Sequence, residues 1–442
     1  MMGRGRRVVN YPTHLTSASS DSESRSHVQP GVVLLVATLD TKGHELAFVR
    51  DVVRGQGLQT LVVDAGSLGP PALTPEITRT QVFQAAGTTL EAVQARQDRG
   101  LAVTDAARGV AALVRSLARE QPIAGILGLG GSAGTEIATA AMRELPFGVP
   151  KVMVSTLASG QTRPYVGGSD IMMVNPVADL AGLNRLTRTA LTNAALSLVG
   201  MIRLPRPAHE AEAETVERPV VAATMFGVTT PCVDRARLVL ESEGAEVLVF
   251  HATGVGGQAM EGLVRDGQVA AVLDLTTTEL ADELVGGVLS AGPDRLEAAG
   301  RHGVPQVVSL GALDMVNFGP RATVPERFAA RRFHQHNPSV TLMRTTPAEN
   351  EALGRRIANS LGRARGPVVL LIPRGGVSAL DAPGQPFYDP DADDALFSTL
   401  MAELASSPHV RLELRDEHLN DPSFARAAAR ALMEILPLRK GL

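Results

Sequence analysis

Short apolar runs separated by polar, helix-like stretches recur along this chain. The first run, from Gly31 to Thr38, is uninterrupted and is typical of a strand buried on both faces. Further runs predict strands at 61–64, 123–127 and 151–155, with helical patterns between them. Strands that alternate with helices predict a parallel, doubly wound sheet.

The same order repeats in the second half of the chain. Apolar runs there predict strands at 219–224, 247–250, 269–274 and 303–309, and two later strands at 367–373 and 410–414 complete the sheet. The first unit carries an extra segment, at about 68–104, that has no counterpart in the second. We therefore predict an α/β fold of two tandem Rossmann-like domains, each with a doubly wound parallel sheet.

Composition divides the chain and excludes several classes of function. We expect a disordered extension at 1–30, rich in Arg and Ser, a nucleotide-binding domain at 31–204 and a second α/β domain at 219–442. The stretch at 205–218 combines prolines with an acidic run and is the predicted linker. The formal net charge of −4 and the absence of tryptophan argue against a nucleic-acid partner.

The length of the apolar runs and the number of cysteines indicate the cellular compartment of the protein. No apolar run approaches the roughly 18 residues that cross a bilayer, so we expect no membrane association. The one cysteine, Cys232, excludes a disulfide within the chain. That fits a reducing compartment, and we expect a cytoplasmic protein.

A glycine-rich turn after the third predicted strand is the strongest candidate for chemistry. Backbone amides in such a turn can approach a phosphate closely, and the helix that follows favours negative charge. The alternative is a tight turn that only needs unusual backbone angles. Neither the dinucleotide fingerprint nor the Walker A spacing applies, because the turn follows the third strand and no lysine follows the glycines. The candidate phosphate ligands are Gly128, Gly130, Gly131, Ser132, Gly134 and Thr135.

Two other loops leave strands of the first unit. In the turn after the first strand, Asp40 is a candidate Mg²⁺ ligand and Lys42 a candidate phosphate counter-charge, beside the hydroxyls of Thr38 and Thr41. A solvated turn is the alternative. The loop after the fourth strand is polar and rich in glycine, which is common in functional loops. Its candidate ligands are Ser155, Ser159, Gly160 and Arg163 for the nucleotide, and Asp170 for metal or ribose.

In the second unit, polar side chains gather after the strand at 303–309. Asp314 and Asn317 come first, and His334 and His336 follow two residues apart. The histidines could bind a metal, act as a general acid–base pair, or make structural hydrogen bonds. These four residues are the candidate catalytic set.

Several uncommon strings occur together in one order. They are Val36–Gly43, Gly128–Thr135, Gly311–Asn317, His336–Pro338 and Pro373–Ser378. Together they resemble the family of the tomato mosaic virus resistance ATP-binding protein, which includes bacterial members of unknown function. The resemblance implies an ATP·Mg²⁺ site in the first domain, a similar second domain and a homodimer.

We therefore expect an ATP·Mg²⁺-binding protein. The nucleotide is expected to drive phosphoryl transfer to, or activation of, a small carboxylate or sugar-like substrate at the domain interface. Two alternatives stay open: a non-catalytic, ATP-responsive binding module, and a metal-dependent hydrolase at His334 and His336.

Overall fold

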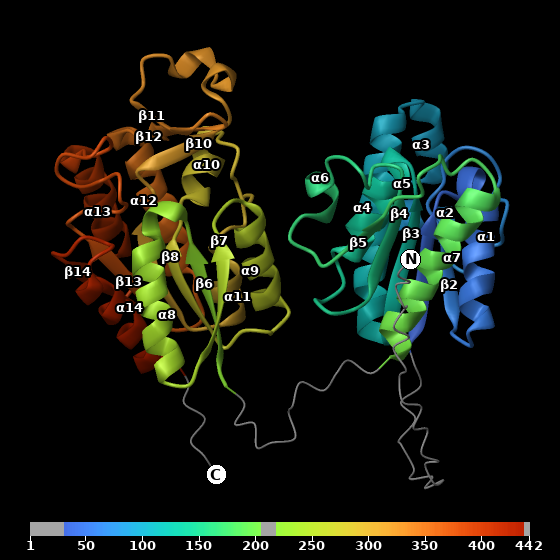
Figure 1. Cartoon of the computed structure of the whole chain (residues 1–442), viewed down its shortest axis with the longest axis horizontal. Helices are drawn as coiled ribbons and strands as arrows, with labels where there is room; N and C mark the ends of the chain where they lie inside the picture. Colours follow the sequence, from blue (N-terminus) through green and yellow to red (C-terminus); the bar gives the residue numbers. More distant parts are fainter. Residues whose placement is uncertain (1–30, 205–217, 437–442) are drawn as a thin grey trace, which may run out of the picture.

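The computed structural model describes residues 31–204 and 218–436. The predicted extension at 1–30 and nearly all of the predicted linker lie outside these residues. The described part forms two α/β units with similar strand order (Figure 1). The predicted fold class, two tandem Rossmann-like domains, is confirmed. No helix of the described residues is long and apolar enough to cross a membrane.

The first unit is a five-stranded parallel sheet in the order β2-β1-β3-β4-β5. Alternate residues of β1 point to opposite faces, so that Val33 packs under α1 and α7, while Leu34 packs under α4 and α5. Its elements are β1 (Val32–Ala37), α1 (Leu39–Gly55), β2 (Thr60–Asp64), α2 (Arg79–Ala85), α3 (Leu90–Arg96), α4 (Arg99–Glu120), β3 (Ile123–Gly130), α5 (Ser132–Met142), β4 (Lys151–Ser155), α6 (Arg163–Val166), β5 (Met172–Val174) and α7 (Arg185–Arg203).

Two features of this unit differ from the sequence prediction. The stretch expected to be a turn at 39–43 is the first turn of α1, with a kink at Lys42 where φ is −127° and ψ is 16°. The extra segment at 68–104 contains α2 and α3, and each begins with a threonine whose side chain accepts a hydrogen bond from a backbone amide. Those caps define two short helices that hydrophobic periodicity alone does not reveal.

The second unit is a six-stranded parallel sheet in the order β14-β13-β9-β8-β6-β7. Its first four strands along the chain therefore take the same relative places as β1 to β4. Its elements are β6 (Val220–Met225), α8 (Thr230–Ser242), β7 (Glu246–His251), α9 (Val255–Arg265), β8 (Ala271–Thr276), α10 (Glu279–Val285), α11 (Ala298–His302), β9 (Gln306–Gly311), β10 (Met315–Phe318), β11 (Phe333–Asn337), β12 (Val340–Arg344), α12 (Pro347–Gly362), β13 (Val368–Pro373), α13 (Pro390–Leu404), β14 (Val410–Arg415) and α14 (Pro422–Ile435).

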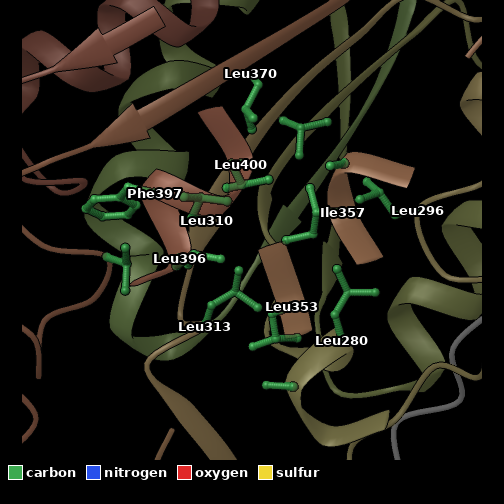
Figure 2. Packing of buried hydrophobic residues seen from close by; sticks show 14 of the residues in the cluster. Leu280, Leu296, Leu310, Leu313, Leu353, Ile357, Leu370, Leu396, Phe397 and Leu400 are labelled. Atoms are coloured by element: carbon green, nitrogen blue, oxygen red, sulfur yellow. The ribbon is translucent and has the colours of Figure 1, made fainter. Parts of the chain in front are cut away.

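The core of this unit lies between the sheet and two long helices. Figure 2 shows Leu310 and Leu370 of the sheet packed against Ile357 of α12 and Leu396 of α13. Leu310 and Leu370 are fully buried. On the opposite face, α8 and α14 pack against the sheet through a separate apolar cluster.

A second, antiparallel sheet is inserted between β9 and α12, in the order β10-β12-β11. One of its faces joins the core through Val316 and Met343. The other packs through Leu342 against Phe226, at the carboxyl end of β6. This small sheet therefore covers the carboxyl edge of the large sheet, and its four- and five-residue strands are too short to stand out in the hydrophobic pattern.

Candidate functional site

The strand order of the first unit creates a crevice between β1 and β3. α1, which follows β1, covers one face of the sheet, and α5, which follows β3, covers the other. Loops that diverge in this way leave a gap at the carboxyl ends of the two strands, where open α/β sheets bind their ligands. A cavity of about 710 Å³ lies at this point. Thr38, Asp40 and Thr41 line it from the β1 side, and Ala133 and Ile137 line it from α5.

The extra segment of the first unit forms the outer wall of this cavity. Residues after β2, the end of α3 and the start of α4 all contribute to it. The lining residues are Ala65 and Ser67 just after β2 and, from this segment, Leu68, Val93, Gln94, Gln97, Asp98, Arg99, Ala102 and Val103. The sequence singled out the segment as additional but assigned no chemistry to it. The second unit has no such segment.

The first turn of α5 presents unpaired amides beside the cavity. The N-cap residue is Gly131, which has no side chain to cap the helix. In the described part of the chain, the N–H groups of Ser132, Ala133 and Gly134 donate to no protein acceptor. Free amides and the helix dipole together attract an anion.

The glycines of the loop have different roles. A Cβ at Gly128 would overlap the Cβ of Ala138, and one at Gly130 would lie 2.8 Å from the Cα of Gly134. These two glycines are required for close packing of β3 against α5. A Cβ at Gly131 would meet only Thr156 Oγ1, at 3.7 Å. Packing therefore does not require glycine at 131.

Two predicted phosphate ligands are hydrogen-bonded inside the protein. Thr135 Oγ1 lies 2.6 Å from Ser155 Oγ and donates to the carbonyl of Gly131. Thr135 and Ser155 are both fully buried. They join α5 to β4, and neither lines the cavity. Ser132, in contrast, is exposed at the start of the helix.

Asp40 lines the cavity but is partly engaged. Its Oδ2 accepts a hydrogen bond of 2.8 Å from the amide of Leu68 and lies 3.8 Å from Arg79, which also pairs with Asp64 at 2.7 Å. The other oxygen, Oδ1, has no protein partner among the described residues. One carboxylate with a free oxygen fits a Mg²⁺ ion that takes its remaining ligands from phosphate and water.

Lys42 does not face this cavity. Its Nζ donates to the carbonyl of Leu180 at 2.6 Å, so the ammonium ties α1 to the loop before α7. The geometry therefore gives no support to its predicted pairing with phosphate, because the ammonium is engaged by that loop and Lys42 does not line the cavity.

The loop after β4 separates from the other two. Arg163 donates to the carbonyl of Thr253 in the second unit at 2.8 Å, and the exposed Ser159 and Gly160 do not line the cavity.

The position of Asp170 differs from the one expected for a metal ligand beside Asp40. Its Oδ1 accepts from Lys151 Nζ at 2.6 Å, and Lys151 is the first residue of β4. Asp170 therefore lies at the amino edge of the sheet, opposite Asp40, and the two cannot share an ion.

Arg99 is the cation that the sequence prediction missed. It is the first residue of α4, it is exposed, it lines the cavity, and it has no ion-pair partner among the described residues. A positive charge opposes the dipole at a helix N-terminus. That mismatch, visible once Asp98 is identified as the N-cap, was the available signal that this arginine is not placed there by the helix itself.

The predicted catalytic set of the second unit does not form an open site. Asp314 and Asn317 are fully buried. Asp314 Oδ2 accepts from Ser378 at 2.8 Å, and Asn317 Nδ2 donates to Asp282 at 2.7 Å. The geometry therefore gives no support to their catalytic assignment, since both side chains are buried and hydrogen-bonded inside the protein.

The two histidines lie on β11 and do not converge on Asp314. His334 packs edge-on against Phe387, and the exposed His336 sits in a bulge where the pairing of β11 with β12 shifts register. Among the residues that the structure describes, no group of three or more His, Cys, Asp or Glu could hold a metal ion. The metal-hydrolase alternative therefore has no support in the geometry.

Three carboxylates share one buried arginine near Asp314. Arg344 pairs with Asp393 at 2.6 Å and lies 3.8 Å from Asp381. Burial, together with the neighbouring charge of Asp381, raises the pKa of Asp314 to about 7. One arginine cannot balance three acids, so Asp314 takes up a proton near neutral pH.

This protonation gives a testable pH dependence. Because the folded pKa of Asp314 is raised, its contribution to stability is fully present below its unfolded pKa and is lost as pH rises through about 7. We expect the second domain to be less stable at pH 8.5 than at pH 5.5. Asp314→Asn mimics the protonated form and should reduce that difference by on the order of 2 kcal/mol. Urea unfolding at both pH values measures it.

The matched control is Asp416→Asn, at a residue whose side chain is 91% exposed. It should leave the pH dependence unchanged. Asp282 and Asp393 also have raised pKa values, about 7 and about 8, so Asp314→Asn should remove only part of the slope. A slope identical to that of the wild type would show that Asp314 is ionised throughout.

In the second unit, side chains of the protein are hydrogen-bonded at the start of α9 and at the carboxyl end of β6. Glu279 Oε1 accepts from the amides of Gly254, at 2.6 Å, and Gly257, at 3.1 Å, at the start of α9. Thr224, at the switch point, donates to Asp274 at 2.7 Å, and Arg295 pairs with both acids. An internal carboxylate from α10, the counterpart of α5, therefore occupies the N-terminus of α9, the helix that follows β7.

The fold and the cavity define a class: a two-domain α/β protein with an open cavity at the strand-order switch point of its first domain. The chain belongs to the Uncharacterised protein family (UPF0261). Its N-terminal domain model matches residues 31–207, and its C-terminal domain model matches residues 218–436.

Relatives occur in bacteria and in a plant. A UPF0261 protein of Clostridium tetani is 49% identical over 404 residues, which cover 91% of this chain and 98% of that protein. The ToMV resistance protein Tm-1(GCR237) of Solanum lycopersicum is 44% identical over 339 residues, 77% of this chain but only 45% of that protein. The predicted family resemblance is confirmed. A solved Streptomyces glycosyltransferase, SsfS6, complexed with thymidine diphosphate, aligns over 92% of this chain and 95% of its own at 13% identity; its TM-score of 0.18 carries no argument.

Proposed function

We propose that the first domain binds ATP as its Mg²⁺ complex in the cavity between β1 and β3. The proposal rests on two features that lie at the same place in the first domain. The cavity lies at the strand-order switch point, and the unpaired amides of α5 border it. A phosphate chain would satisfy those amides and would extend past Thr38 and Thr41.

The charges around the cavity support a bound polyphosphate. Arg99 has no ion-pair partner among the described residues and would neutralise phosphate oxygens. Asp40 would hold Mg²⁺ through Oδ1. When bound, the ion would screen the phosphate charges from that carboxylate. The volume of about 710 Å³ is within the usual range for small-molecule sites.

Calorimetry with the full chain tests the proposal directly. We expect ATP·Mg²⁺ to bind with measurable heat and to bind more weakly when EDTA removes the ion. No heat with any purine nucleoside triphosphate would overturn the proposal.

Arg99→Ala should weaken ATP binding by about tenfold or more, because a charge-assisted hydrogen bond to phosphate contributes about 1.5–3 kcal/mol. Thermal stability should be unchanged or slightly higher, since the substitution removes an unfavourable charge from the start of α4. The control is Arg119→Ala, at an exposed residue near the other end of the same helix. Equal affinities for the two variants would exclude a phosphate contact by Arg99.

If the protein is an enzyme, we propose that it uses ATP to transfer a phosphoryl group to a second substrate or to activate that substrate. A cavity of about 830 Å³ lies between the two domains and is lined by Arg143 and Arg163 from the first and Arg265 from the second. Guanidinium groups suit a carboxylate or a phosphorylated sugar. ADP, AMP or pyrophosphate formed with candidate acids or sugars would support transfer. Tight ATP binding without products would support the non-catalytic, ATP-responsive module instead.

A homodimer, which the family resemblance implies, completes the proposal. Light scattering after size-exclusion chromatography, with and without ATP, tests it. A mass of about one chain under both conditions would remove the dimer from the proposal.

A further inference from the structure

Gln97 has an unusual backbone conformation at the wall of the first cavity. It ends α3 with φ 51° and ψ 24°, in the left-handed region. Glycine or asparagine usually occupies this position, because a longer side chain raises the energy of the left-handed conformation. The glutamine side chain lines the cavity, and its carboxamide has no hydrogen-bond partner among the described residues.

The cavity wall that includes Gln97 also carries several aliphatic side chains. Val93, Val103 and Ile137 line the same cavity, together with Leu68. A flat heterocycle would pack between these aliphatic side chains, while the phosphates lie toward α5. No aromatic side chain lines the cavity, so stacking would contribute little to the choice of base.

Two other polar residues at this wall are already engaged. Gln94 Nε2 donates to the carbonyl of Ser67 at 2.8 Å and so holds the loop after β2. Asp98 Oδ1 accepts from the amide of Leu101 at 2.9 Å and so caps α4. Gln97 is left as the carboxamide that can turn toward a ligand.

A carboxamide offers one acceptor beside two donors. Adenine offers an amino donor beside a ring-nitrogen acceptor, which matches this pattern in a bidentate pair. Along the edge where adenine carries N6 and N7, guanine presents two acceptors, O6 and N7, which a carboxamide cannot match with both of its groups. Guanine N1–H and N2–H form a pair of donors, which a carboxylate matches better. We infer that Gln97 is the residue that selects adenine over guanine in this cavity, an inference that rests on the proposed nucleotide function.

Gln97→Gly separates recognition from backbone structure. Glycine removes the carboxamide and relaxes the left-handed residue, so thermal stability should be unchanged or higher. ATP affinity should fall by about tenfold or more, because one bidentate contact is lost. Affinity for inorganic tripolyphosphate should change by less than about twofold, since the phosphate end of the cavity is intact.

Two companion variants keep the inference testable if Gln97→Gly does not fold. Gln97→Asn tolerates the left-handed conformation and keeps a shorter carboxamide, so it should retain a preference for ATP over GTP. Gln97→Glu should lower the ratio of ATP to GTP affinity by about tenfold, because its two acceptors match the guanine donors.

The outcomes distinguish the two proposals. If tripolyphosphate and ATP both fail to bind the wild-type chain, the proposed function falls. If both bind and Gln97→Gly retains wild-type ATP affinity, or if Gln97→Glu leaves the ATP-to-GTP ratio unchanged, the assignment of Gln97 falls while the nucleotide site stands. Loss of both ligands in Gln97→Gly would show a structural role and would also overturn the assignment.

Discussion

Replacing Gly131 with valine is expected to abolish nucleotide binding, with a loss of about 100-fold or more in ATP affinity. The residue is the N-cap of α5, and a branched side chain there would crowd the approach of phosphate to the free amides. The fold should survive, because the new Cβ would meet only Thr156 Oγ1, at 3.7 Å. The backbone at 131 has φ −82° and ψ −155°, which valine adopts readily. Loss of a glycine N-cap destabilises a helix by under about 1 kcal/mol.

Two other glycines serve as controls for this variant. Gly200→Val places the same side chain in α7, where no heavy atom lies within 4 Å of the new Cβ, and should leave binding and stability unchanged. Gly128→Val should unfold the first domain, because its Cβ would overlap Ala138. Calorimetry and thermal melting report the two effects separately. Wild-type affinity in Gly131→Val would place the phosphates elsewhere.

Replacing Arg295 with methionine is expected to produce the largest loss of stability in the second domain, about 3–5 kcal/mol. The arginine is 1% exposed and pairs with Asp274 at 2.5 Å, Glu279 at 2.7 Å and Glu261 at 3.5 Å. Methionine fills a similar volume but leaves these carboxylates without a counter-charge in the interior. Burial already raises the pKa of Glu261, and loss of the Arg295 charge should raise it further.

Urea unfolding of the full chain measures this loss, and hydrogen exchange assigns it to the second domain. The control is Arg301→Met, which removes an exposed arginine that pairs with Glu297 within one helix turn. Exposed pairs of this kind contribute about 0–1 kcal/mol, so this variant should remain close to the wild type. A similarly small effect for Arg295→Met would show that the buried acids do not depend on Arg295 as their counter-charge. ATP binding by the first domain should survive in both variants.

The sequence predicted the strands better than the helices between them. Runs such as Val33–Val36 are apolar at every position because both faces of the sheet are covered, and such runs are visible without an alignment. α2 and α3 are only seven residues long and are defined by threonine caps, so their periodicity is too brief to detect. The strands of the small sheet over β6 were missed for the same reason.

The sequence also identified the loops of the candidate site better than the individual side chains in them. The loops after β1 and β3 were identified, and Thr38, Asp40 and Thr41 do line the cavity. Lys42 and Asp170 were misplaced, because a residue's place in a loop does not fix the direction of its side chain or the edge of the sheet on which it lies. Arg99 and Gln97 were missed because they belong to a segment whose role depends on where it folds back.

The sequence by itself determined that this chain forms two parallel α/β units and that a glycine-rich turn follows the third strand. Both conclusions depend on local patterns of burial and backbone freedom, which the order of residues records directly. Only the tertiary structure decided which turn stays open. In the first unit the extra segment folds over the crevice, where free amides lie beside an arginine that has no ion-pair partner among the described residues. In the second, Glu279 accepts from the amides at the start of α9, and the short antiparallel sheet packs at the carboxyl end of β6. That difference arises from contacts between residues far apart in the chain, and no local pattern encodes them.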